Sequence, residues 1–571
     1  MGTDSSVLGV NGYAHDAGVA LVRDGRIIQV HEEERFDRVR KTSAFPVESL
    51  QFLQASAELD PSQIRKIGFP WHPYRVAKMV WALVFDSFPP AYRLLTRQAS
   101  PRMNVPAALR FLGVRRAVSR ALGGRVSGQV RFVPHHLAHA CNAYFLSPFD
   151  EAVVLVMDGF GDECSTSSFV ARGGCLEHLR KNDPLNSLGV LYAVVTKHLG
   201  YQTVTGEGTV MALSSHGADD LVEKFREVIH LHHDGTYSVD DRFFSYRRYG
   251  ELRPVSDHFV RAFGPPRRPG GPVLDRHRAL AHALQRRTEE VVLNAVQALK
   301  RETGISSVCF SGGVALNCLV NGRVAREGGF QRLFVSPNPN DAGQALGAAL
   351  AITHLNEPRS HPASVQTAFL GASYSSDEIR NELVSSCVRW EQREDFVDVA
   401  AREIAAGRIV AWYQGASEMG PRALGNRSLL ADPRSSDVVG RLNRIKARED
   451  FRPFAPSVIA DRAPEYFEGV VDSPYMSLAF RVKEGRREEI SAVLARDGTA
   501  RVHTVTQSQS PLFWRLIKAF ESRTGVPMLL NTSYNTDGPI VGSPGDALRT
   551  FERSSIDLLV LGDYVVRRHV A

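Results

Sequence analysis

The amino-acid sequence predicts an α/β protein with two domains. Short apolar runs of strand character, such as residues 152–157 (AVVLVM), alternate with helical patterns, which is typical of α/β folds. In the longest helical pattern, residues 279–300, apolar side chains recur at steps of three and four. A polar, aperiodic stretch with two prolines, residues 356–368, predicts a linker. A chain of 571 residues has room for a domain on either side of that linker.

The first domain, residues 1–355, is expected to begin with consecutive antiparallel strands. Two apolar runs at 7–11 and 18–22 are followed by the turn dipeptide Asp24-Gly25 and then by a third apolar run. Strand-like runs joined by such a dipeptide are typical of β-hairpins.

Two further regions complete the predicted architecture. Residues 71–121 are rich in Trp, Phe, Leu and Arg, and they predict a helical insertion in the first domain. Residues 369–571 are expected to form the second domain. In it, strand-like runs at 410–413 and 558–562 flank a region rich in loops and arginines.

The composition is that of an ordinary globular protein from a reducing compartment. Lys and Arg together number 69 against 62 for Asp and Glu, a net charge of +7. This excess fits anionic substrates but is too weak to indicate nucleic acid. The six cysteines form no C-x-x-C pair, no secretory signal is visible, and the apolar patch at 76–85 is too short to span a bilayer. We therefore expect a cytoplasmic monomer or homodimer without a nucleic-acid or membrane partner.

Two histidines and two aspartates are candidate metal ligands. Pro134 predicts a helix start, which places His135 and His139 four residues apart on one helix face. Asp158 ends an apolar strand, and Asp341 precedes a run of small residues. Nitrogen and oxygen ligands of this kind suit Fe, Mn or Zn. Each element also has a plainer interpretation, because paired histidines are often core residues and an aspartate often caps a helix.

A basic, loop-rich segment of the second domain is the candidate anion site. Between residues 415 and 458, Gly and Pro punctuate a set of basic side chains: Arg422, Arg427, Lys446, Arg448 and Arg452. Guanidinium groups match phosphate oxygens in pairs, although a solvated basic face is the alternative. Arg501 and the trio Asn531, Thr532 and Ser533, which follows an apolar strand, are further candidates. A turn held by Asn and Ser side chains would explain the trio equally well.

Together these motifs resemble the bacterial O-carbamoyltransferases of the NodU/CmcH type. The similar segments are the opening with Gly12, His15 and Asp16, EEERFDRVRK at 32–41, PHHLAHA at 134–140, the DG-x-G turn at 158–161, SGGVALN at 311–317, DAG-x-ALGAA at 341–349, GPRALGNRS at 420–428 and NTSYN at 531–535. The resemblance covers most of the chain and is weakest at about 71–121 and 218–275.

The resemblance implies an actin/hexokinase-like (ASKHA, Kae1-like) first domain and a YrdC-like α/β second domain. In the first domain, the four candidate ligands would bind Fe(II) or another divalent metal. Nucleotide contacts there are implied for Lys41, Gly159, Gly312, Gly313 and Asn317. The second domain would take ATP and carbamoyl phosphate as co-substrates, accompanied by Mg(II), and form carbamoyl adenylate. Its implied binding residues are Arg422, Arg427, Arg448, Arg501, Asn531, Thr532 and Ser533, with Arg452 and Lys446 as catalytic groups.

The implied second step passes the carbamoyl group to a hydroxyl of a small molecule, an antibiotic or its sugar. His15 is the candidate for deprotonating that hydroxyl, and Arg38 and Lys41 for contacting the nucleotide or the acceptor. The aromatic insertion favours a large apolar glycoside or macrolide, although helix packing also explains its composition. One position departs from the family pattern, because Thr209 stands where a lysine is usual.

Other functions remain as alternatives. An actin-like small-molecule kinase would use the first domain alone, and a tRNA threonylcarbamoylation enzyme would use relatives of both domains. A non-catalytic binding protein is a third alternative, suggested by the change at Thr209. A metalloprotease is disfavoured, because the histidine pair lacks the H-E-x-x-H glutamate.

Overall fold

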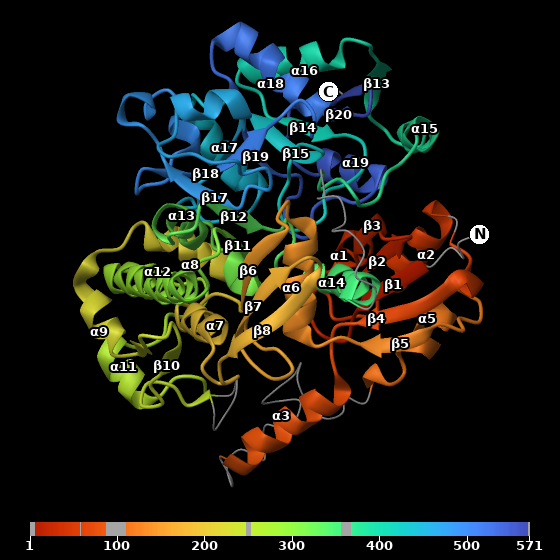
Figure 1. Cartoon of the computed structure of the whole chain (residues 1–571). Coiled ribbons are helices and arrows are strands. Elements are labelled where there is room, and N and C mark those ends of the chain that lie inside the picture. Colours follow the sequence, from red (N-terminus) through yellow and green to blue (C-terminus); the bar gives the residue numbers. More distant parts are fainter. Residues whose placement is uncertain (1–5, 58, 87–109, 247–252, 356–366, 569–571) are drawn as a thin grey trace. The chain divides into compact units, whose positions relative to one another are not determined.

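The computed structural model describes residues 6–57, 59–86, 110–246, 253–355 and 367–568 (Figure 1). The chain forms two compact units. The first unit comprises Met1–Glu33 and Lys41–Val365, and the second comprises Glu34–Arg40 and Gln366–Ala571. A short segment that the sequence places in the first domain thus belongs with the second unit. The predicted linker, residues 356–368, lies almost entirely outside the described residues.

The described residues of the first unit form two five-stranded sheets that repeat one topology. In the sheet of order β3-β2-β1-β4-β5, β1 to β3 are antiparallel and β4 and β5 are parallel to β1. In the sheet of order β12-β11-β6-β7-β8, β6 to β8 are antiparallel and β11 and β12 are parallel to β6. The α/β prediction is confirmed, and the repeated topology is consistent with an actin/hexokinase-like fold.

The strands of these two sheets are β1 (Ser6–Asn11), β2 (Gly18–Arg23), β3 (Arg26–Glu32), β4 (Ile64–Phe69), β5 (Gln129–Phe132), β6 (Glu151–Met157), β7 (Thr166–Arg172), β8 (Cys175–Lys181), β11 (Ser307–Ser311) and β12 (Arg332–Val335). A separate hairpin pairs β9 (Ile229–Leu231) with β10 (Tyr237–Val239).

The turn between β2 and β3 follows directly from its sequence. Asp24 has φ 50° and Gly25 has φ 79°, the left-handed values that a type I′ hairpin turn requires at both central positions. Asp and Gly are among the residues that adopt this conformation most readily. Arg23 pairs with Arg26 across the turn, as the hairpin pattern predicts.

Two helices lie between the sheets of the first unit and position its candidate site. Helix α6 (His135–Leu146) packs on β6 and β11, and α14 (Gln344–Leu350) packs on β1, β4 and α6. Small residues make these contacts close. A Cβ atom added to Gly347 would lie 2.0 Å from the Ala138 carbonyl oxygen, and one added to Gly9 would lie 1.8 Å from the Ala345 carbonyl oxygen.

The other helices of the first unit lie around this core. The predicted long helix is α12 (Asp275–Thr303), which ends where Gly304 takes a left-handed φ of 69°. The predicted insertion contains α3 (Pro73–Asp86) and α5 (Val114–Ala121), and its residues 87–109 lie outside the described part. The remaining longer helices are α2 (Val47–Ser56), α7 (Leu188–His198), α8 (Glu207–Ser214), α11 (Asp257–Phe263) and α13 (Cys318–Glu327).

The described residues of the second unit are organised around one mixed nine-stranded sheet, of order β13-β21-β20-β14-β15-β19-β16-β18-β17. Its strands are β13 (Arg389–Gln392), β14 (Val410–Tyr413), β15 (Arg427–Ala431), β16 (Ala455–Ile459), β17 (Leu478–Arg481), β18 (Thr499–Val505), β19 (Met528–Ser533), β20 (Leu558–Leu561) and β21 (Tyr564–Arg567). The predicted runs at 410–413 and 558–562 correspond to β14 and β20, which pair in parallel. The YrdC-like assignment stays a prediction.

Helices cover the sheet of the second unit. They are α15 (Ser376–Val384), α16 (Phe396–Ala405), α17 (Asp437–Ile445), α18 (Pro511–Thr524) and α19 (Pro544–Glu552). Helices α16 and α18 pack against each other, and α19 contacts β14 and β20. No helix in the described part of either unit combines the length and hydropathy needed to cross a bilayer.

Replacement of Gly9 by alanine tests the close packing of α14 on β1. The added methyl group would collide with backbone atoms of α14, so we expect the free energy of unfolding to fall by about 3 kcal/mol. Thermal and urea unfolding measure this. Gly208→Ala is the matched control, because a Cβ atom there meets nothing within 4 Å and alanine favours the helix. Equal stability of the two variants would contradict the packing.

Candidate metal centre and cationic site

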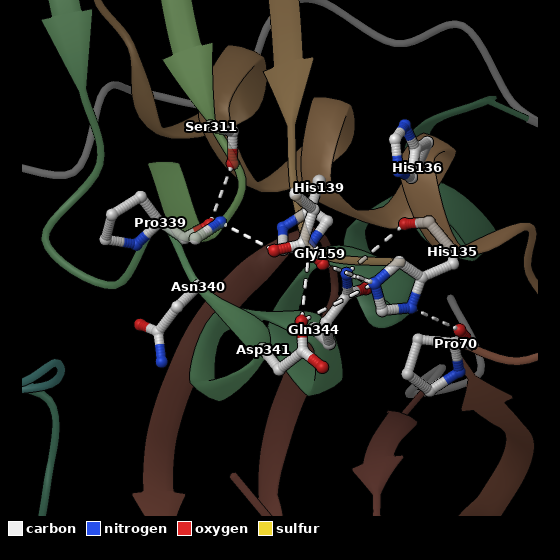
Figure 2. A network of polar contacts seen from close by, with 12 residues as sticks. Pro70, His135, His136, His139, Gly159, Ser311, Pro339, Asn340, Asp341 and Gln344 are labelled. Atoms are coloured by element: carbon white, nitrogen blue, oxygen red, sulfur yellow. Dashed lines mark hydrogen bonds and ion pairs between the residues drawn. The ribbon is translucent and has the colours of Figure 1, made fainter. Parts of the chain in front are cut away.

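The four predicted ligands converge in the first unit, and Figure 2 labels three of them, His135, His139 and Asp341. His135 and His139 lie on the first turns of α6, Asp158 directly follows β6, and Asp341 begins the turn that leads into α14. One ligand atom from each residue lies within 4.8 Å of the others, and all four residues are buried. The His135 Nε2 atom is 3.4 Å from Asp158 Oδ2 and 3.5 Å from Asp341 Oδ1. The corresponding distances from His139 Nε2 are 3.7 and 3.4 Å.

The surroundings of the cluster fit a bound cation. His135 Nδ1 donates to the Pro70 carbonyl oxygen at 3.3 Å, which directs Nε2 toward the carboxylates. Such an outer hydrogen bond is typical of metal-binding histidines. Within the described residues, His139 Nε2 and Asp341 Oδ1 are buried without a hydrogen-bond partner. A divalent cation held by two imidazoles and two carboxylates would satisfy both atoms.

The electrostatics of the cluster agree with that fit. Burial alone would lower the pKa of His135, but Asp341 and Asp158 raise that pKa to about 10. Burial would raise the pKa of Asp158, but the close approach of both imidazoles, at 3.4 and 3.7 Å from Asp158 Oδ2, holds that pKa well below its ordinary value. A proton on His135 therefore balances part of the carboxylate charge in this arrangement. A metal ion would take over that balance and displace the proton.

A second group of side chains joins the cluster through Asp341. His15 Nε2 lies 3.6 Å from Asp341 Oδ2, and His15 Nδ1 lies 2.9 Å from Asp16 Oδ2. Lys41 Nζ in turn pairs with Asp16 Oδ1 at 2.7 Å. Burial lowers the pKa of His15, but Asp341 and Asp16 raise it by more, so the pKa lies above its ordinary value. With 29% of its side chain exposed, His15 connects the buried cluster to the surface.

Two asparagines that the sequence analysis does not single out organise this group. Asn11 Nδ2 donates to the carbonyl oxygens of Asp16 and Asp341 at 2.9 and 3.2 Å. Asn340 Nδ2 donates to Asp16 Oδ2 at 3.1 Å. Their places in the chain, at the end of β1 and directly before a predicted ligand, are signals that could have identified them.

The glycines predicted to contact a nucleotide also serve the chain's own structure. Gly312 has φ 91°, and a Cβ atom there would lie 2.1 Å from the Met157 carbonyl oxygen. Gly313 donates its N–H to Asp158 Oδ1 at 2.8 Å and so orients that ligand. At Gly159 an added Cβ atom would meet nothing within 4 Å, which leaves the backbone open beside Asp158.

Two other predicted positions have structural surroundings. The Asn317 side chain accepts from the Val320 N–H at the start of α13 and donates to Gln285. Thr209, which stands in the place of the usual family lysine, is buried in α8. These contacts leave the predicted nucleotide role of Asn317 a prediction.

The second unit gathers the predicted cations. The Lys446 ammonium donates to Ser533 and Asn535, with 2.7 Å to the Ser533 carbonyl oxygen and 2.6 Å to Asn535 Oδ1. Burial and the positive charges of Arg448, Arg452 and Arg40 hold the pKa of Lys446 well below its ordinary value. Burial, Arg452 and Arg501 lower the pKa of Arg448 to about 9. Cations that disfavour one another's charge form a site that an anion would stabilise.

Arg427 occupies a different environment from these cations. Its guanidinium is fully buried, lies 3.6 Å from the centre of the Tyr413 ring, and donates to the carbonyl oxygens of Gln414, Gly415, Asn426 and Ala372. Its donors therefore hold the chain's own loop together, and the ligand-binding role of Arg427 stays a prediction.

The remaining predicted residues lie around the same loops. Asn531 is buried on β19 and donates to the Ala423 carbonyl oxygen at 3.0 Å and to Ser457 Oγ at 2.9 Å. Thr532 is half-buried beside it, opposite Leu429 of β15. Arg422 is half-buried in the loop before β15.

Comparison with known proteins covers both units. Residues 6–350 match the family model described as carbamoyltransferase N-terminus, and residues 401–568 match the carbamoyltransferase C-terminus. The nodulation protein NolNO of Sinorhizobium fredii is 36% identical over 98% of this chain and 80% of its own length. A 3'-hydroxymethylcephem-O-carbamoyltransferase of Amycolatopsis lactamdurans is 39% identical over 45% of this chain and 48% of its own.

Among solved structures, full-length HypF in its phosphate- and nucleotide-bound form covers 62% of this chain and 56% of its own. It does so at 13% identity and a TM-score of 0.34, which is too low to support an argument.

The Asp341→Asn variant tests the metal centre. It keeps the shape of the side chain but removes the charge that both histidines face. We expect metal affinity to fall at least about a hundredfold, since changes to outer partners alone cost 10- to 100-fold. Metal content after dialysis against Fe(II), Mn(II) or Zn(II), and the rise in Tm on metal addition, measure this.

The control for this experiment is His136→Gln. The His136 ring points away from the cluster and bonds Ser167 Oγ at 2.8 Å. This variant should keep one metal ion per chain. Full metal content in Asp341→Asn would contradict the assigned centre.

Proposed function

Because the chain belongs to the carbamoyltransferase family, we propose that it is an ATP-dependent O-carbamoyltransferase acting in two steps. The first step, in the second unit, converts carbamoyl phosphate, ATP and one water into carbamoyl adenylate, pyrophosphate and phosphate. The second step, in the first unit, transfers the carbamoyl group to a hydroxyl of a small molecule and releases AMP. The acid-rich cluster and the cation-rich cluster, each within its own unit, are the observation that carries this proposal.

The cationic site has the chemistry that adenylate formation needs. Both substrates are polyanions, and negative charge spreads over the phosphate oxygens as the new bond forms. Lys446 and Arg452 would stabilise that charge, with Arg448 and Arg501 beside them. Ser533, a hydrogen-bond acceptor of Lys446, would contact the same ligand. Mg(II) is expected to accompany ATP here.

The first unit has the groups that carbamoyl transfer needs. A divalent metal, Fe(II) being our proposal, would act as a Lewis acid toward the phosphate of the leaving AMP when bound. We propose that His15, whose ring is held by Asp16, takes the proton of the acceptor hydroxyl. Lys41 would contact the nucleotide phosphate. The carbonyl carbon gains the acceptor oxygen and loses the adenylate oxygen.

For the acceptor we propose a natural product with a free hydroxyl, such as an antibiotic or its sugar. A relative that acts on a cephem supports this class. The aromatic segment after β4 supports an apolar acceptor, because the Trp71 ring lies 3.9 Å from that of His135. Tyr74, Trp81 and Phe85 of α3 expose large apolar side chains.

Mass spectrometry of full-length protein with ATP, carbamoyl phosphate and Mg(II) tests the first step. We expect carbamoyl adenylate and pyrophosphate from wild type, and about 100-fold slower formation in Arg452→Ala, the size of loss typical when a charge-stabilising donor is removed.

Arg523→Ala is the matched control for Arg452→Ala. It removes an exposed arginine that, on α18, donates to the Ala519 carbonyl oxygen and pairs with Asp398. This control should behave as wild type. The proposal fails if wild type binds ATP yet releases no pyrophosphate.

A further inference from the structure

The segment Glu34–Arg40 is fixed to the second unit by arginines. Arg35 Nη2 donates to the Gly420 carbonyl oxygen at 2.7 Å, and Arg38 donates to the carbonyl oxygens of Ile540 and Pro539 at 2.6 and 2.8 Å. Arg40 Nε donates to the Gly538 carbonyl oxygen at 3.0 Å. The segment therefore belongs to the cation-rich unit through contacts separated by hundreds of residues in sequence.

The carbonyl group that Arg40 contacts is part of the support of Lys446. The same Gly538 oxygen accepts a hydrogen bond from Asn535 Nδ2 at 2.6 Å. The other amide atom of that side chain, Asn535 Oδ1, accepts from Lys446 Nζ at 2.6 Å. Arg40 thus holds one end of a chain of hydrogen bonds whose other end is the buried ammonium group.

Arg40 also acts on Lys446 through its charge. It is one of the three arginines whose charge disfavours the protonated form of Lys446. Arg40 is exposed, and the other residues that act on Lys446 in this way or bond to it lie beyond residue 440 in the sequence. Within the described residues, the Arg40 side chain makes one hydrogen bond, to the Gly538 carbonyl oxygen. A residue so placed adds positive field to the site and restrains the turn that carries Asn535.

We propose that Arg40 is a positioning residue of the anion site in the second unit. It holds the 535–538 turn so that Asn535 fixes Lys446 for the phosphate groups of carbamoyl phosphate and ATP. This inference rests on the proposed function. It assigns to the second unit's chemistry a residue from the part of the chain that matches the carbamoyltransferase N-terminus.

Steady-state pyrophosphate release by the full-length protein tests the inference. For Arg40→Ala we expect kcat/KM for carbamoyl phosphate to fall about tenfold, mostly through KM, because positioning and charge act on anion binding. Arg40→Lys keeps the charge and a donor, and it should return to within about threefold of wild type. Since screening weakens the contribution of an exposed charge, wild-type KM should also rise more steeply with salt than that of Arg40→Ala.

Two measurements, the Tm and the KM of Arg40→Ala, distinguish a positioning role of Arg40 from a general loss of folded protein. The Tm of Arg40→Ala should equal that of wild type and of the Arg523→Ala control, and a lowered Tm with a uniform loss of kcat would overturn the positioning role. Unchanged KM values in an active Arg40→Ala would overturn it as well, while the proposed function stands. If wild type itself releases no pyrophosphate, the proposed function fails and the inference falls with it.

Discussion

The carboxylate of Asp341 is the group on which the site of the first unit depends. It is almost fully buried, and its two oxygens face different partners. Oδ1 faces the imidazoles of His135 and His139, whereas Oδ2 faces His15. Buried carboxylates are costly unless positive charge compensates them. The site therefore requires either a protonated His135 or a bound cation. The same carboxylate links that charge to His15, the residue proposed to take the acceptor proton.

Small residues make this arrangement possible. Gly347 against Ala138 brings α14 to α6, and Gly9 against Ala345 brings α14 to β1. Helix α6 carries both histidines, and α14 follows directly from Asp341. The distance between the histidines and Asp341 is consequently set by backbone packing rather than by flexible side chains. The second unit has the opposite charge pattern to this buried carboxylate site. Its loops bring cations close to Lys446, and a bound anion would offset their mutual repulsion.

Part of this arrangement could be predicted from the sequence, and the reasons are local. The Asp24-Gly25 turn and the helix of the histidine pair depend on neighbours in the chain, so their patterns predict them. The four ligands are predicted as a set because their residue types suit one metal and because the family resemblance joins them. The structure brings them together from three separated elements.

The features that the sequence did not reveal depend on long-range contacts. A basic motif does not show that Arg427 turns inward to four carbonyl oxygens while Lys446 and Arg448 form a cationic cluster. The assignment of Glu34–Arg40 to the second unit likewise depends on hydrogen bonds to the carbonyl oxygens of Gly420 and Ile540, which are distant in sequence. The chain positions of Asn11 and Asn340 are visible in the sequence, but the hydrogen bond from Asn11 to the Asp341 carbonyl oxygen forms only when β1 and the turn at Asp341 lie together.

In the proposed function, the two units hold separate sites with separate chemistry. The most direct test of this claim is pyrophosphate release by protein from which the buried metal has been removed with a chelator, and to which only Mg(II) has then been returned. We expect carbamoyl-phosphate-dependent release at the rate of the Fe(II)-loaded protein, because the groups proposed to form the adenylate lie in the second unit. Loss of that release together with the buried metal would contradict the separation of the two sites.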